Sequence, residues 1–92
     1  MSAVVEIPSA LQRFVNQQKR VEVPEGTVKD IIASLVGKHA GLKEQLFDDQ
    51  GRVRSFVNIY LNDEDIRHVK DLETVVKAGD VIHIVPSIAG GA

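Results

Sequence analysis

Residues 27–36 read TVKDIIASLV and carry the clearest periodic signal in the chain. Their apolar side chains recur at i, i+3, i+4, i+7 and i+8, at Val28, Ile31, Ile32, Leu35 and Val36. This spacing places one apolar stripe on a helix. Thr27 can accept a hydrogen bond from the free N–H groups of the first turn, and Gly41 suits a left-handed cap after the last turn. The stretch therefore predicts one amphipathic helix.

Short β-prone runs lie on both sides of this helix. Five runs are predicted to be strands: residues 3–7, 19–23, 56–61, 64–67 and 81–85. We expect 56–61 to be the central strand and 64–67 to be a short edge strand that carries Ile66 inward. Residues 9–18 should form an ordered loop, and residues 41–47 a short turn of helix. This order predicts an α+β fold in which a mixed four- to five-stranded sheet packs one face on one main helix.

The other face of the sheet is predicted to stay open. Side chains alternate along a strand, so a helix-facing Ile59 turns Phe56 and Tyr60 to the opposite face. The last strand likewise turns His83 and Val85 outward. These four outward side chains predict a partly apolar surface on which a partner protein docks.

Composition excludes several classes of function. The 92 residues include 11 Lys and Arg against 13 Asp and Glu, a net charge of −2 that lacks the basic field nucleic-acid backbones require. No apolar stretch approaches the length of about 20 residues that a membrane span needs, so we expect a cytoplasmic protein. There is no cysteine, and His39, His68 and His83 lack ligand spacing, so we expect neither a metal site nor a catalytic residue. Without a P-loop or dinucleotide fingerprint, the chain is expected to bind no cofactor, and any ATP must be held by a partner.

The last six residues, 87–92, read SIAGGA and follow Pro86, which ends the last predicted strand. We expect a folded domain over residues 1–86 and a flexible tail over residues 87–92. Extended from Pro86 to Gly91, the tail reaches about 20 Å at roughly 3.3 Å per residue. Because glycine has no Cβ, Gly90 and Gly91 can pass through a narrow channel. This arrangement suggests a body that docks while its terminal carboxylate reaches the active site of another protein.

Three features together resemble the ubiquitin-like sulfur-carrier family that includes ThiS and MoaD: the turn Gly79-Asp80, the strand 81–85 and the ending Ile88-Ala89-Gly90-Gly91. Within that family, residues 54–67, RSFVNIYLNDEDIR, are similar to carriers of the CysO type. The resemblance implies a β-grasp, or ubiquitin-like, fold. It also implies that a MoeB- or ThiF-like adenylyltransferase uses ATP to adenylate the carboxylate of Gly91, after which sulfide yields a thiocarboxylate. In this family the carrier is a protein co-substrate and not a catalyst.

Ala92 departs from the family pattern, because it follows the diglycine and keeps Gly91 in an amide. If Ala92 is native, the resemblance implies that a JAMM-type zinc peptidase first removes it. The alternative is that Ala92 is an added residue that is not native. The resemblance then implies sulfur donation to the synthesis of cysteine, or of homocysteine and methionine, through a PLP-dependent sulfhydrylase. Three alternatives stay open: conjugation of Gly91 to lysines as a ubiquitin-like modifier, sulfur supply to thiamin or molybdopterin synthesis, and a purely noncovalent interaction module.

Overall fold

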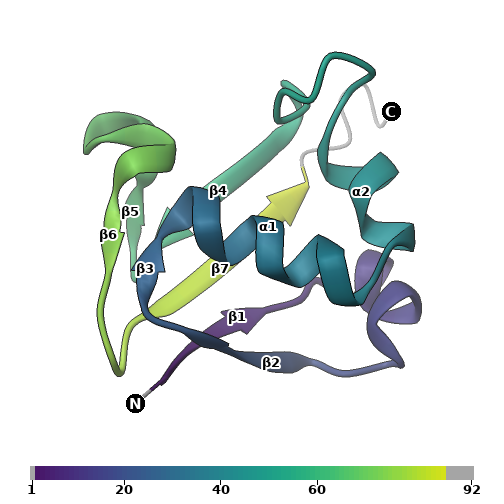
Figure 1. The fold of residues 1–92 in the computed structure, drawn as a ribbon, viewed down its shortest axis with the longest axis horizontal. Helices are drawn as coiled ribbons and strands as arrows, with labels where there is room; N and C mark the ends of the chain where they lie inside the picture. The colour runs from purple at the N-terminus through teal and green to yellow at the C-terminus, as the bar shows by residue number, and fades with distance from the viewer. Residues whose placement is uncertain (1, 87–92) are drawn as a thin grey trace.

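The computed structural model describes residues 2–86. The predicted site residues of the tail lie outside the described residues: Ile88, Ala89, Gly90, Gly91 and Ala92. In the described part, two helices lie on one face of a five-stranded sheet, as Figure 1 shows: α1 (Val28–Lys38) and α2 (Gly41–Leu46). The predicted α+β class is confirmed.

The sheet has the strand order β2-β1-β7-β4-β5. Its strands are β1 (Ser2–Glu6), β2 (Arg20–Pro24), β4 (Val57–Leu61), β5 (Glu64–Asp65) and β7 (Val81–Pro86). β1 runs antiparallel to β2 and parallel to β7, whereas β4 runs antiparallel to both of its neighbours. The remaining elements are a small two-stranded sheet and short 3-10 helices: β3 (Gly26–Thr27), β6 (Val75–Val76), η1 (Ser9–Val15), η2 (Ile66–His68) and η3 (Asp71–Glu73). The predicted mixed sheet on one main helix is confirmed.

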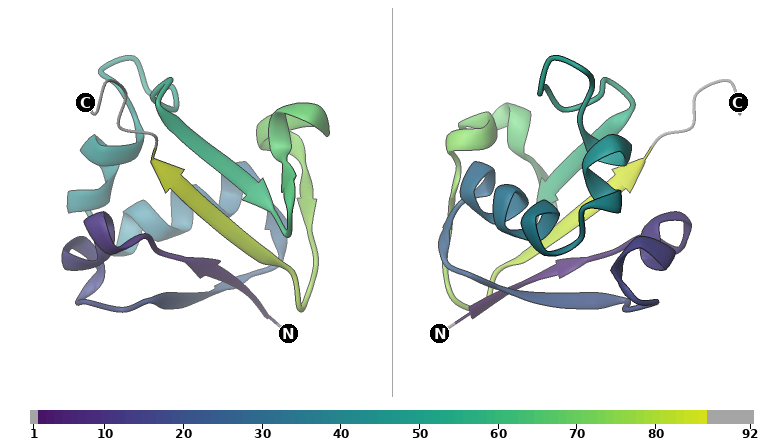
Figure 2. Two further views of the ribbon diagram at one scale, coloured as in Figure 1. Left: turned by 180° about the vertical axis from the view of Figure 1, so that it is seen from behind. Right: turned by 45° about the vertical axis from the view of Figure 1, so that its right-hand side comes forward.

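The core lies between the sheet and α1, which pack against each other in Figure 2. The helix begins as predicted, with Oγ1 of Thr27 accepting a hydrogen bond from the backbone N–H of Asp30 at 3.2 Å. Val36 of the predicted stripe is half-buried. The other four residues of the stripe are buried: Val28, Ile31, Ile32 and Leu35. Each such fully buried aliphatic side chain stabilises the fold by roughly 1.5–3 kcal/mol relative to an exposed one.

The prediction that Gly41 caps α1 in a left-handed conformation is wrong. α1 ends at Lys38 with His39 as its cap, and Gly41 begins α2. A Cβ on Gly41 would lie 2.9 Å from Cδ1 of Phe14, closer than real Cβ atoms approach other carbons. A glycine therefore suits this position because α2 packs tightly against η1, and not because the backbone needs a positive φ.

The prediction that the run 56–61 forms the central strand is also wrong. β7 is central and lies between β1 and β4, while β2 and β5 form the two edges of the sheet. Beyond β4 there is only the two-residue strand β5. The strand that comes last in the sequence is inserted between two earlier ones, and this insertion depends on long-range pairing that local alternation does not report.

The edge strand predicted over residues 64–67 is shorter than expected. β5 ends at Asp65, whose Oδ1 accepts a hydrogen bond from the backbone N–H of Arg67 at 2.9 Å. This contact caps η2 and turns the chain out of the sheet. Ile66 still reaches the core as predicted, with 3% of its surface exposed. The loop predicted over residues 9–18 is ordered and contains η1.

Candidate functional site

A row of five side chains crosses the open face of the sheet, which is turned toward the viewer in the left view of Figure 2. The register pairs Arg20 with Glu6, Glu6 with His83, His83 with Tyr60, and Tyr60 with Asp65. A neighbour of each of them along the chain is buried in the core, so these five side chains face away from the helices. The structure thus brings Tyr60 and His83 together, while docking on this face stays a prediction.

Glu6 contacts two side chains of this row, Arg20 and His83. Its Oε2 lies 3.2 Å from Nε of Arg20, and its Oε1 lies 3.1 Å from Nδ1 of His83. The carboxylate therefore orients the imidazole from one side while Tyr60 borders it on the other. Sequence reasoning missed Glu6 and Arg20, although the alternation that turned His83 outward applies equally to their strands.

At the other end of the row, Arg67 holds a second polar cluster. Its Nη2 lies 2.7 Å from Oδ2 of Asp65 and donates a hydrogen bond to Oδ1 of Asn58 at 2.8 Å. The side-chain and backbone hydrogen bonds that Arg67 donates to Asp65 lower the pKa of this carboxyl from 3.8 to about 2. The same pairing raises the pKa of Arg67 above its usual value. The cluster keeps the side of the face along β5 polar and charged at neutral pH.

Two exposed apolar residues lie where the sheet face meets the start of the tail. Val85, two residues beyond His83 on β7, is 44% exposed, and Phe56, which directly precedes β4, is 40% exposed. The last residue of β7, Pro86, pairs with Val57, and we call this pair the tail base. The predicted docking residues therefore extend from the middle of the sheet to the tail base.

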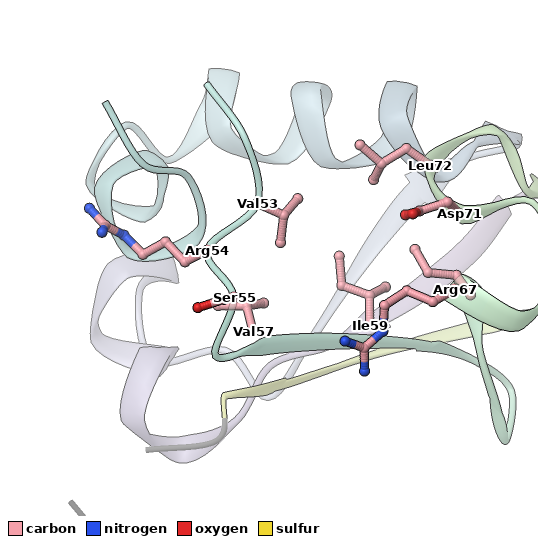
Figure 3. Close-up of a pocket in the computed structure, with 9 residues that line it drawn as sticks. Val53, Arg54, Ser55, Val57, Ile59, Arg67, Asp71 and Leu72 are labelled. Carbon is pink, nitrogen blue, oxygen red and sulfur yellow. The ribbon is translucent and has the colours of Figure 1, made fainter. Parts of the chain in front are cut away.

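A pocket of about 200 Å³ lies beside the tail base, between β4 and the 3-10 helices η2 and η3 (Figure 3). The arginines that border it are already bonded: Nε of Arg54 donates to the backbone O of Glu44 at 2.8 Å, and Arg67 is held by Asp65. The remaining lining is mostly apolar and includes Val53, Val57, Ile59, Ile66 and Leu72. The volume is below the roughly 300–1,000 Å³ of ligand pockets, so we assign no cofactor to it.

The described residues supply no arrangement for metal binding, since no three His, Asp or Glu side chains in residues 2–86 gather as a ligand set. None of the helices in this part of the chain has the length and apolar character needed to cross a membrane.

Comparison with known proteins shows that the pattern of the ThiS family matches residues 5–91. The chain belongs to the ThiS family. The sulfur carrier protein CysO of Mycobacterium tuberculosis is 38% identical to this ThiS-family chain over 93 residues, covering 99% of the chain and 100% of that protein. The family resemblance expected from the strand 81–85 and the diglycine is thereby confirmed.

Solved structures confirm the β-grasp fold of this ThiS-family chain. The crystal structure of the Amycolatopsis orientalis BexX/CysO complex matches with a TM-score of 0.86 at 39% identity, covering 97% of the chain and 99% of that structure's chain. The crystal structure of the small archaeal modifier protein 1 from Haloferax volcanii matches with a TM-score of 0.84 at 26% identity, covering 99% and 100%. Fold and sequence together make the chain a ubiquitin-like sulfur carrier protein similar to CysO.

Proposed function

We propose that this ThiS-family chain carries sulfur on Gly91 for the synthesis of cysteine, or of homocysteine and methionine. The observation that supports this most directly is the extent of the family match, which runs to residue 91 and leaves only Ala92 beyond it. Gly91 is thus the residue whose carboxylate becomes the sulfur-bearing group, and Ala92 is a residue to be removed. A JAMM-type zinc peptidase fits this removal.

The chemistry proceeds in three balanced steps. The peptidase hydrolyses the amide between Gly91 and Ala92 and frees the Gly91 carboxylate. A MoeB- or ThiF-like adenylyltransferase joins this carboxylate to AMP from ATP and releases pyrophosphate. Sulfide then attacks the acyl adenylate, AMP leaves, and a thiocarboxylate remains. Adenylation is required because a carboxylate oxygen is a poor leaving group, and no cysteine of the carrier takes part.

In this proposal the carrier binds its partner enzymes through its surface and extends its tail into their active sites. ATP and sulfide are used through the partner enzymes, and a PLP-dependent sulfhydrylase accepts the sulfur. The open sheet face, with Tyr60, His83, Val85 and Phe56, is the docking surface that aligns the tail with each partner's active site. Its exposed apolar side chains lie next to the tail base, which supports this role.

Intact-mass measurement tests the proposal. The chain ending at Gly91 and the chain ending at Ala92 are each incubated with a MoeB- or ThiF-like enzyme, ATP and sulfide. We expect exchange of one oxygen for sulfur only in the chain that ends at Gly91. Failure of that chain to form either an acyl adenylate or a thiocarboxylate would contradict the proposal.

A second candidate function, conjugation through Gly91 to lysines of other proteins, is favoured by the likeness to the small archaeal modifier protein 1. The same measurement, made in a lysate of the source organism, separates the two candidates. Isopeptide adducts on lysines support the modifier, whereas a thiocarboxylate without adducts supports the carrier. If the sulfur is delivered to a thiamin or molybdopterin enzyme instead, the carrier function stands and only the acceptor changes.

A further inference from the structure

A second surface feature lies on the helix side of the molecule, away from the row on the open sheet face. It is a groove of about 250 Å³ between α1, α2 and the loop that follows α2. Its apolar walls come from three parts of the chain: Ile32, Ala33 and Val36 on α1, Phe47 after α2, and Leu72 on η3. Figure 1 views the molecule from this side, with α1 in front of the sheet.

The charged residues that line the groove are both lysines. Lys29 lies on the first turn of α1, and Lys43 lies on α2, so the two ammonium groups come from different walls. Within residues 2–86, neither lysine forms an ion pair. The groove therefore combines apolar walls with two lysines that form no ion pair within residues 2–86.

The loop wall of the groove is held in place by its own hydrogen bonds. Oδ1 of Asp48 accepts hydrogen bonds from the backbone N–H groups of Gln50 and Arg52, at 2.9 and 3.0 Å. Gly51, which lines the groove, lies between them with a φ of 80°. These contacts lower the pKa of Asp48, so the carboxylate is ionised and the loop stays braced at neutral pH. A preformed wall reduces the ordering cost that a binding partner would otherwise meet.

We propose that this groove binds a partner peptide segment that inserts bulky apolar side chains between α1 and α2 and places carboxylates on Lys29 and Lys43. The volume is smaller than the roughly 300–1,000 Å³ of pockets for free small molecules, which favours peptide side chains as occupants. An amphipathic helix laid in an apolar groove is an established mode of recognition. Because the groove and the open sheet face lie on opposite sides of the sheet, one partner can hold the groove while another engages the tail.

The test uses the full chain and two synthetic helical peptides, followed by NMR titration of the backbone amides. The first peptide carries Leu at positions i and i+4 with flanking Glu residues, and the second has Lys in place of each Glu. We expect the Glu peptide to shift the amide signals of Ala33, Val36 and Leu72 and to bind at least about tenfold more tightly than the Lys peptide. Equal binding of both peptides, absence of shifts at millimolar peptide, or shifts confined to the sheet face would overturn the proposal.

Charge-reversal variants supply the matched control. Lys43→Glu changes a lysine that lines the groove, whereas Lys38→Glu makes the same change at an exposed lysine of α1 that does not line it. We expect only Lys43→Glu to weaken binding of the Glu peptide, by about tenfold. An equal loss of affinity in both variants would count against the groove as the binding site. Ala33→Glu, at an exposed position on the groove wall, should block the peptide while thiocarboxylation at Gly91 continues. Loss of both activities in this variant would overturn the independence of the two surfaces.

Discussion

At the scale of single residues, two glycines of the helical layer have opposite roles. Gly37 lies inside α1, and a Cβ added there would meet no atom within 4 Å. Gly41 begins α2, and a Cβ there would press on the ring of Phe14. The same chemical change therefore tests helix propensity at one site and close packing at the other.

We predict that Gly37→Ala raises the free energy of unfolding by up to about 1 kcal/mol, because alanine loses less backbone entropy than glycine when it enters the last turn of α1. Gly41→Ala should lower it by about 1 kcal/mol or more, because the half-buried Phe14 ring must move. Urea unfolding of both variants measures the difference. Combining Gly41→Ala with Phe14→Leu should recover stability. If Gly41→Ala alone stabilises the chain as much as Gly37→Ala, the packing argument is wrong.

Asp65 gives a prediction for the dependence of stability on pH. Its pKa in the folded protein, about 2, is below the ordinary 3.8, because Arg67 hydrogen-bonds to the ionised form. The stabilisation is therefore present above about pH 4 and is lost as the pH falls through 2. We expect Asp65→Asn to destabilise the fold at pH 7, and this difference from the parent chain should shrink between pH 4 and pH 2. Urea titrations at several pH values measure this difference, with Asp63→Asn as the control for an exposed turn residue. A difference in the free energy of unfolding between Asp65→Asn and the parent chain that stayed constant with pH would contradict the prediction.

At the scale of secondary-structure elements, β7 connects the candidate docking surface with the core. Its inward residues Ile82 and Ile84 are buried, and its outward residues His83 and Val85 lie on the open face. The same strand ends at the tail base, so one element sets the position of the candidate docking residues His83 and Val85 relative to Pro86. Under the proposed function, a partner that recognises the outward side of β7 would bind next to the tail base.

This arrangement predicts that Val85→Asp weakens binding of the MoeB- or ThiF-like adenylyltransferase at least about tenfold, because it places a charge in an apolar contact. Val75→Asp is the matched control: Val75 is 58% exposed, but it lies on β6, outside the five-stranded sheet. Isothermal titration calorimetry with both variants measures the effect, and their melting temperatures show whether each is folded. Equal affinities for the two variants would remove Val85 from the docking surface.

At the scale of the whole molecule, the two-layer architecture separates two surfaces. The sheet layer presents the row from Arg20 to Asp65 and leads to the tail, while the helix layer presents the groove with its two lysines. The shared core lies between the two surfaces, so we expect that occupation of one does not block the other. A small chain with net charge −2 can in this way present a positively lined groove and a mixed-charge sheet face at once.

The amino-acid sequence alone was sufficient to predict the helix capped by Thr27, most of the strands, and the outward direction of Tyr60 and His83. Periodicity reports these features because it records which side of each element is apolar. The sequence also contains the diglycine ending, and the family resemblance of that ending implied the chemistry at Gly91. That inference came from residue identity and required no folded contacts.

Only the tertiary structure decided the central place of β7, the role of Gly41, the links of Glu6 to Arg20 and His83, and the groove. Each of these depends on which segments far apart in the sequence become neighbours. Local patterns show that a strand has an apolar face but not which strand lies beside it, since many pairings would bury the same side chains. The neighbours were determined by packing of the whole chain around one core, and the charge pairs and cavities followed from that packing.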